Sequence, residues 1–202
     1  MAIAAKKVTL LGAFRNYANL LARVKIEDAQ GRSLGESGFK RALDLIIKQN
    51  KLGKKLCFIG NGGSAAIASH QATDFFKNGG VRAASFNDAS ILTCLANDYN
   101  YTEIFSRQIE RMTNTGDILF AISSSGKSSN IIKGVEAARR NGCHIVTCSG
   151  FDENNPLRRL GEVNFYVPSH SYAHVENAHL LICHTFVDAL MALRGEPPFW
   201  LN

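Results

Sequence analysis

The sequence has 202 residues, of which 46% are hydrophobic and 20% are charged, which excludes a disordered or low-complexity chain. This length suffices for one well-buried domain and is short for two, so we expect a single domain over residues 1–202. The net charge of +6 favours anionic partners. Because basic and acidic residues are interspersed rather than clustered, no nucleic-acid partner is expected.

Three features of the sequence predict that the protein is located in the cytoplasm. The N-terminal segment reaches Arg15 without a small-residue cleavage site, which argues against a signal peptide. No segment has the uncharged apolar length of a membrane helix, so no contact with a membrane is expected. The five cysteines are scattered and lack a CxxC spacing, as expected for reduced cysteines in a cytoplasmic protein.

Two amphipathic helices are predicted in an N-terminal helical region, residues 1–52. Apolar residues recur at helical spacing over residues 8–28 and again over residues 37–50. These helices are too short for a DNA-binding extension. We expect them to pack against other subunits of an oligomer.

Five short apolar runs follow, separated mostly by helical patterns. They cover residues 55–59, 83–86, 117–122, 144–148 and 163–167. Alternation of strands and helices predicts an α/β core over residues 53–194, in which a five-stranded parallel sheet lies between two layers of helices. Ligands of such sheets bind beyond the carboxyl ends of the strands. The polar stretch at residues 150–156 is expected to be a surface loop.

A glycine-rich turn, GNGGS at residues 60–64, follows the first predicted strand directly. Its glycines allow a sharp turn and close approach of a ligand, while Asn61 and Ser64 offer side-chain hydrogen bonds. The spacing is that of neither a dinucleotide fingerprint nor a P-loop. Such turns are common in α/β folds. This one therefore indicates a binding site only together with a second polar loop at the same edge of the sheet.

That second loop, ISSSGKSS at residues 122–129, lies between a predicted strand and a predicted helix. Backbone N–H groups of the first helical turn and the helix dipole favour an anion there. Gly126 allows the backbone to come close to a ligand. An ordinary serine N-cap is the simpler alternative, although one serine would suffice for it. The candidate phosphate-binding residues are Ser123, Ser124, Ser125 and Ser128.

Two predicted helices carry histidines and carboxylates on one face. His70 and Asp74 are four residues apart, and Glu176 and His184 are eight apart. These side chains suit a divalent metal such as zinc and would equally serve as an acid and base pair. The simpler alternatives are a surface pair of His70 with Asp74, a first-turn carboxylate at Glu176, and core histidines at His179 and His184.

Four motifs in the same order resemble the sugar isomerase (SIS) domain family and, within it, the phosphoheptose isomerases. The motifs are GNGGS at residues 60–64, AND at 96–98, ISSSGKS at 122–128, and the helical segment from Glu176 to His184. The resemblance extends from the N-terminal helices to about Leu193. It implies the flavodoxin-like SIS fold.

The resemblance also implies an activity, the aldose–ketose isomerisation of sedoheptulose 7-phosphate to D-glycero-D-manno-heptose 7-phosphate through an enediolate, for bacterial surface heptose. It implies a homotetramer with a phosphorylated sugar as substrate and one Zn²⁺ per subunit at subunit interfaces. Carried onto this sequence, it implies catalytic roles for Asp74 and His184. The implied metal ligands are His70, Asp74, Glu176 and His184. The implied substrate contacts are Asn61, Gly62, Gly63, Ser64, Asn97, Asp98, Ser123, Ser124, Ser125, Ser128 and Glu176.

Three positions depart from the family pattern. Asp74 stands where the family has a glutamate, one methylene longer; Glu176 replaces the usual glutamine, and Lys127 replaces the usual asparagine. The alternative function is a non-catalytic SIS protein that binds sugar phosphates or associates with a replication initiator. Relatives of that second kind lack the acidic residue and the last-helix histidine, whereas this sequence retains Asp74 and His184.

Overall fold

A single mixed sheet of six strands organises the computed structural model, which describes residues 9–196. The strands are β1 (Lys25–Glu27), β2 (Leu56–Ile59), β3 (Ala83–Ser85), β4 (Ile118–Ser123), β5 (His144–Gly150) and β6 (Val163–Val167). Their spatial order is β1-β6-β5-β4-β2-β3. Strands β2 to β6 are mutually parallel, and β1 pairs antiparallel with β6 at one edge.

The predicted α/β class is confirmed, but the prediction of a five-stranded, wholly parallel sheet is wrong in its detail. The five expected strands are all present, and β1 is an additional sixth strand. The sequence pattern predicts a helix over residues 8–28, but the helix ends at Leu21, and β1 occupies the last part of that stretch. A strand of three residues is too short to show a period in the sequence, and its register depends on contacts with β6, such as Ile26 opposite Phe165.

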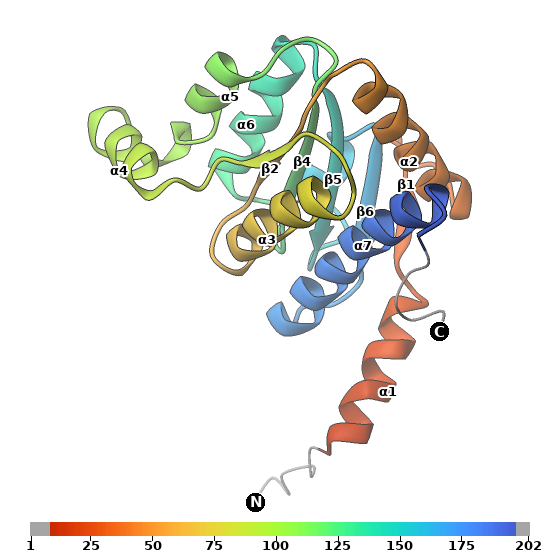
Figure 1. Ribbon diagram of the computed structural model, residues 1–202. Coiled ribbons are helices and arrows are strands. Elements are labelled where there is room, and N and C mark those ends of the chain that lie inside the picture. Colours follow the sequence, from red (N-terminus) through yellow and green to blue (C-terminus); the bar gives the residue numbers. More distant parts are fainter. Residues whose placement is uncertain (1–8, 197–202) are drawn as a thin grey trace, which may run out of the picture.

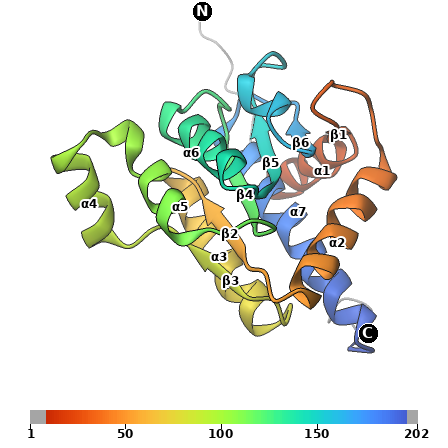
Figure 2. The same ribbon diagram turned by 90° about the horizontal axis from the view of Figure 1, so that it is seen from above.

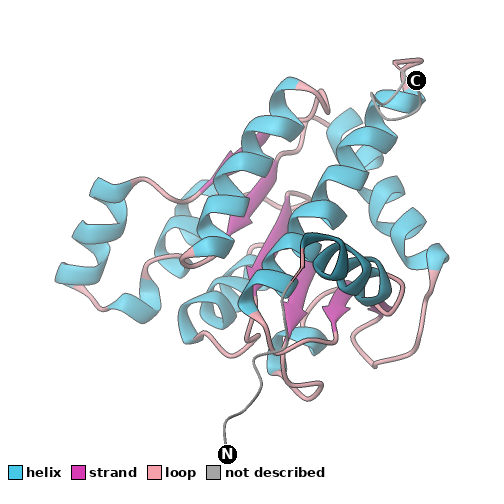
Figure 3. Ribbon diagram, turned by 90° about the horizontal axis from the view of Figure 1, so that it is seen from below, coloured by secondary structure: helices cyan, strands magenta, loops and turns pink. Residues whose placement is uncertain are grey.

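Helices cover both faces of the sheet (Figures 1 and 3). The α-helices are α1 (Leu10–Leu21), α2 (Glu36–Lys51), α3 (Gly63–Lys77), α4 (Ala89–Asp98), α5 (Ser106–Met112), α6 (Ser129–Arg140) and α7 (Tyr172–Leu193), and η1 (Tyr101–Glu103) and η2 (Pro156–Arg159) are 3-10 helices. Successive side chains of a strand point to opposite faces. In β2, Phe58 therefore packs in the core under α2, α3 and α7, whereas Ile59 packs in the core under α5 and α6.

Two helices, α1 and α4, extend away from this layered core (Figure 1), and the projection of α4 is also visible in Figure 2. In α1 the side chains of Leu10, Leu11 and Phe14 are exposed, and Leu20 is its buried residue. No residue of α4 is buried within the described part of the chain. Within the same range, residues 9–196, no helix combines the length and the apolar character needed to cross a membrane.

The direction of the strand order reverses between β2 and β4. After β2 the chain continues outward to β3 on one side, whereas β4, β5 and β6 follow one another on the other side. The carboxyl ends of β2 and β4 are adjacent, because Ile59 lies opposite Ala121. In open α/β sheets, a reversal of this kind opens the crevice in which ligands bind.

Candidate functional site

A pocket of about 240 Å³ lies at this reversal point. It is lined by the glycine turn after β2, the loop of residues 123–128 after β4 (the serine loop) and the first turns of α7: Asn61, Gly62, Gly63, Ser64, Ser123, Ser124, Ser125, Ser128, Tyr172 and Glu176. The two loops that the sequence pattern predicted as binding loops therefore form the walls of one pocket. Tyr172 was not predicted, although it precedes Glu176 by four residues and so shares its helical face.

The serine loop offers hydrogen-bond donors to this pocket. The hydroxyl of Ser124 is buried and has no hydrogen-bond partner among the described residues. Ser128 occupies the N-cap position of α6 but makes no capping hydrogen bond with its side chain. The backbone N–H of Ile131 in the first turn of α6 donates to Oδ1 of Asn130, at 2.9 Å. The other first-turn N–H groups and the positive dipole end of α6 lie beside the pocket, an arrangement that binds an anion such as phosphate.

The glycine turn is shaped by the approach of α7. A Cβ atom on Gly63 would overlap the carboxylate of Glu176, so this position accepts only glycine while that contact exists. Asn61 exchanges two hydrogen bonds of 2.9 Å with Asn130 in the first turns of α6. Its Oδ1 also accepts a hydrogen bond from the Tyr101 hydroxyl, at 3.1 Å. These contacts join the two walls of the pocket, and the sequence pattern predicted neither Asn130 nor Tyr101.

A second cluster lies farther along α3 and α7, which pack against each other. Nδ1 of His184 lies 2.9 Å from Oδ2 of Asp74, and Nε2 of His184 lies 3.3 Å from Nε2 of His70. The side-chain amide of Asn78 donates to the other carboxylate oxygen of Asp74. Two imidazole nitrogens cannot both donate in one contact. One of the two Nε2 atoms is therefore unprotonated and presents its lone pair to the other.

The donor set of this cluster fits a divalent metal. His70, Asp74 and His184 each offer one ligand atom, and these atoms all lie within 4.8 Å of one another. Two imidazoles and one carboxylate are a usual catalytic zinc set, with a position left for water or substrate. The same pairing of Asp74 with His184 could also transfer a proton.

Glu176, Asn97 and Asp98 lie apart from the cluster of His70, Asp74 and His184. Glu176 precedes His184 by eight residues, about 12 Å along the helix axis, and its carboxylate rests on Gly63 in the pocket. Asn97 and Asp98 are exposed at the end of α4 and hydrogen-bond to each other, at 2.9 Å. Within one chain, the structure brings three of the four predicted metal ligands together, and it leaves the 97–98 pair outside the pocket lining.

His179 is a core residue in this structure. It is fully buried in α7, and Nε2 donates to the Ser149 carbonyl at the end of β5, at 3.1 Å. Burial lowers the pKa of His179 to about 4, although the hydrogen bond with Ser149 opposes the shift. The imidazole is therefore neutral at pH 7, and it ties the helix that carries Glu176 and His184 to the sheet.

Comparison with known proteins agrees with this geometry. A family model of the SIS domain matches residues 27–150. Phosphoheptose isomerases of Helicobacter hepaticus and Shewanella denitrificans are 35% and 38% identical over 163 and 174 residues, which cover 78% and 82% of this chain and 83% and 87% of theirs. The solved structure of the Neisseria gonorrhoeae phosphoheptose isomerase superposes with a TM-score of 0.78 at 28% identity, over 91% of this chain and 97% of that one.

Proposed function

This chain belongs to the SIS domain family, among its phosphoheptose isomerases, and from that premise we propose that it isomerises sedoheptulose 7-phosphate to D-glycero-D-manno-heptose 7-phosphate. One observation carries the proposal: α3 and α7 each contribute to the anion pocket with their first turns and to the His70–Asp74–His184 cluster farther along. A sugar phosphate anchored in the pocket can therefore present its carbonyl end to acid and base groups. The relatives give no support to the non-catalytic alternative.

The serine loop holds the phosphate in this proposal. Ser123, Ser124, Ser125 and Ser128 donate hydroxyl hydrogen bonds, and the N-terminus of α6 adds backbone N–H groups and its dipole. The sugar hydroxyls lie along Asn61, Gly62, Gly63 and Ser64, with Glu176 opposite them. The resemblance adds Asn97 and Asp98 as substrate contacts. For them to contact the substrate, α4 of the same subunit or of a second subunit must approach the pocket.

Asp74 and His184 perform the proton transfer, in either order. One of them removes the proton from the carbon next to the carbonyl, which leaves an enediolate. The proton then returns to the neighbouring carbon, and the hydroxyl proton passes from one enediolate oxygen to the other, so that ketose and aldose interconvert without net oxidation. The 2.9 Å contact between Nδ1 of His184 and Oδ2 of Asp74 lets the two side chains share the proton during this cycle.

We further propose that His70, Asp74 and His184 hold one Zn²⁺ per subunit. A bound zinc ion supplies Lewis-acid stabilisation of negative charge on the substrate oxygens. Glu176 is the fourth ligand that the resemblance implies, but its carboxylate against Gly63 favours a role beside the sugar. A homotetramer in the cytoplasm, where the five cysteines would stay reduced, completes the proposal.

The first test measures two properties of the purified protein. Incubation with sedoheptulose 7-phosphate in D₂O should yield the aldose product and deuterium at the carbon next to the carbonyl, and metal analysis should find one zinc per chain. Asp74→Ala and His184→Ala should each lower kcat by about 10²–10⁴-fold, because each removes one member of the proton-transfer pair.

The control is Asp44→Ala, since Asp44 forms an exposed ion pair with Lys40 on α2. It should leave turnover unchanged, and all three variants should keep the oligomer mass of the parent protein. Full turnover in both site variants would overturn the proposed roles. Zinc binding without any deuterium exchange would instead point to another substrate.

A further inference from the structure

Asn155 packs against the rear of the serine loop. Gly126 has a φ of +62°, and a Cβ atom on it would overlap Oδ1 and Cγ of Asn155. The backbone N–H of Leu157 donates to the Gly126 carbonyl, at 3.1 Å. Gly126, which does not line the pocket, is thus held by Asn155, the N-cap residue of η2, and by Leu157 within η2.

The amide of Asn155 is fixed in one orientation. Its side chain is buried, and Nδ2 lies within hydrogen-bond distance of three oxygens: the Ser149 hydroxyl and the carbonyls of Gly150 and Asp152, at 3.3, 3.1 and 2.8 Å. Oδ1 accepts from the backbone N–H of Arg158, at 3.1 Å, and so caps η2. A carboxylate in this place would set an acceptor oxygen against two carbonyls and a negative charge behind the anion pocket.

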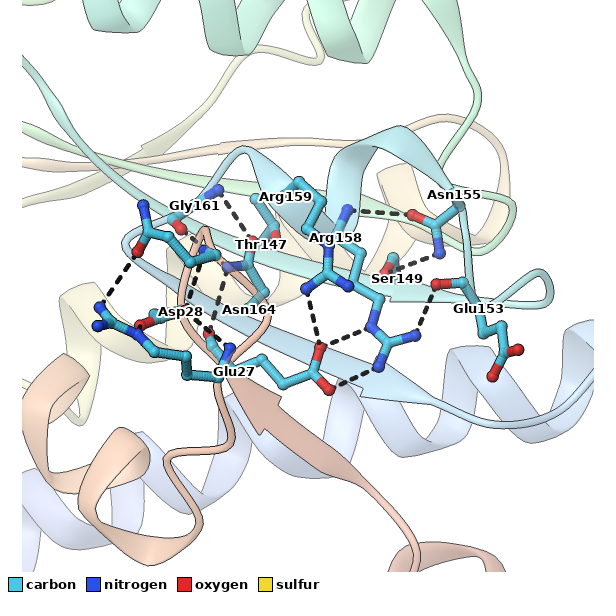
Figure 4. A network of polar contacts seen from close by, with 12 residues as sticks. Glu27, Asp28, Thr147, Ser149, Glu153, Asn155, Arg158, Arg159, Gly161 and Asn164 are labelled. Carbon is cyan, nitrogen blue, oxygen red and sulfur yellow. Dashed lines mark hydrogen bonds and ion pairs between the residues drawn. The ribbon is translucent and has the colours of Figure 1, made fainter.

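A buried ion pair anchors the segment that carries Asn155 (Figure 4). Nε and Nη2 of Arg158 donate to the two carboxylate oxygens of Glu27 in β1, at 2.7 and 2.6 Å. The guanidinium also lies 4.0 Å from the ring centre of Tyr166, and Nη1 donates to the Glu153 carbonyl, at 2.6 Å. A bidentate pair of this kind fixes geometry as well as charge.

We propose that Asn155 is a positioning residue for the phosphate-binding loop. By filling the space behind Gly126 and capping η2, it holds the loop so that the Ser124 hydroxyl and the first N–H groups of α6 face the bound phosphate. The inference rests on the proposed function only for the identity of the sugar. It applies to any phosphate held by this loop.

The test compares Asn155→Asp with Asn154→Asp. Asn154 is the adjacent residue and is exposed, so both variants add the same charge to the same loop. Asn155→Asp should weaken the binding of inorganic phosphate, measured by isothermal titration calorimetry, by about tenfold or more. It should raise KM for sedoheptulose 7-phosphate to a similar extent while kcat changes little. Asn154→Asp should match the parent protein in all three quantities.

A merely structural role predicts a different result. In that case Asn155→Asp lowers the melting temperature, but the folded protein keeps its phosphate affinity and KM, and the proposal is overturned. If Asn155→Asp does not fold, Asn155→Ala is measured in the same way, and an unchanged KM and phosphate affinity again overturn it. Loss of phosphate affinity in a protein that shows no isomerase activity would refute the proposed function and leave this inference standing.

Discussion

Ser124 lines the pocket, and its hydroxyl bonds to no other described residue. The side chain is 5% exposed, and Oγ has no hydrogen-bond partner among residues 9–196. A buried hydroxyl without a partner costs about 1–3 kcal/mol. We therefore expect Ser124→Ala to raise the free energy of unfolding slightly, by up to about 1 kcal/mol, while KM for the sugar phosphate rises about tenfold because one donor to the phosphate is lost.

Urea unfolding and steady-state kinetics on the same preparation check this pair of effects. Ser90→Ala is the control, since Ser90 is exposed on α4 and its hydroxyl bonds to Asp88. It should leave KM at the parent value. A Ser124→Ala variant that loses stability and keeps its KM would show that the hydroxyl supports the fold rather than the ligand.

The sequence predicted Ser124 and could not predict Asn155. The serine run is recognisable because its chemistry is local: several hydroxyls directly follow an apolar strand and precede a helix. The stretch of residues 150–156 was expected to be a surface loop, and Glu153 and Asn154 are indeed exposed. Asn155 in the same stretch is 1% exposed. Its burial depends on Gly126, which lies 29 positions earlier in the chain.

At the scale of elements, Asp117 joins the starts of two adjacent strands, β2 and β4. One carboxylate oxygen accepts from the backbone N–H of Lys55, at 3.0 Å, and the other accepts from the Lys55 ammonium and from the backbone N–H of Asn114. Burial alone would raise the pKa of Asp117, but these hydrogen bonds outweigh it, and the pKa is lowered. The folded state therefore favours the charged carboxylate.

This shift gives the stability a defined pH dependence. The unfolded chain binds the proton at the ordinary Asp pKa, about 3.9, so the stabilisation is complete above that pH. It is lost as the pH falls through the lower pKa of the folded state. Asp117→Asn should lower the free energy of unfolding by about 2–3 kcal/mol at neutral pH, and the difference from the parent should shrink below about pH 4.

Urea unfolding from neutral to acidic pH measures the effect, with Asp44→Asn as the matched control. The ion pair of Asp44 with Lys40 is exposed, so that variant should stay within about 0.5 kcal/mol of the parent throughout. A difference for Asp117→Asn that stays constant across the pH range would show that lost packing, rather than lost charge, causes the destabilisation.

The elements that the sequence predicted share strong local patterns. The five parallel strands are apolar runs between turns, and α2, α3 and α7 have long apolar faces, so their existence follows from periodicity. β1 has three residues, and Glu27 becomes buried there through its ion pair with Arg158, 131 positions later in the chain. Because tertiary contacts determine such an edge strand, no local pattern could have predicted it.

At the scale of the whole molecule, topology gathers the site from distant segments. The serine loop and the glycine turn meet because β4 is adjacent to β2, and this follows from the parallel α/β pattern together with the rule for ligand crevices. The helical spacing of His70 with Asp74 predicted their shared face. That His184 faces them depends on how α3 crosses α7, and the position of Asn97 and Asp98 outside the pocket depends on where α4 lies. Spacing along one helix determines neither arrangement.

The exposed apolar side chains of α1 argue for a larger assembly. Leu10, Leu11 and Phe14 are 69%, 68% and 59% exposed, although their helical spacing is that of a face that packs against protein. The proposed homotetramer would bury them against other subunits. Phe14→Glu should then weaken the assembly, because it removes about 1.5–3 kcal/mol of apolar burial and introduces a charge, so the dissociation constant should rise at least about tenfold.

Sedimentation velocity over a range of protein concentrations measures this shift, and circular dichroism confirms that the helical content is unchanged. Leu52→Glu is the matched control, because Leu52 is 61% exposed at the end of α2 and lies on another helix. If Phe14→Glu sediments like the parent while the parent is a tetramer, the contacts between subunits lie elsewhere, and the bare face of α4 becomes the next surface to substitute. If the parent itself sediments as a monomer, the tetramer proposal fails and α1 needs another partner.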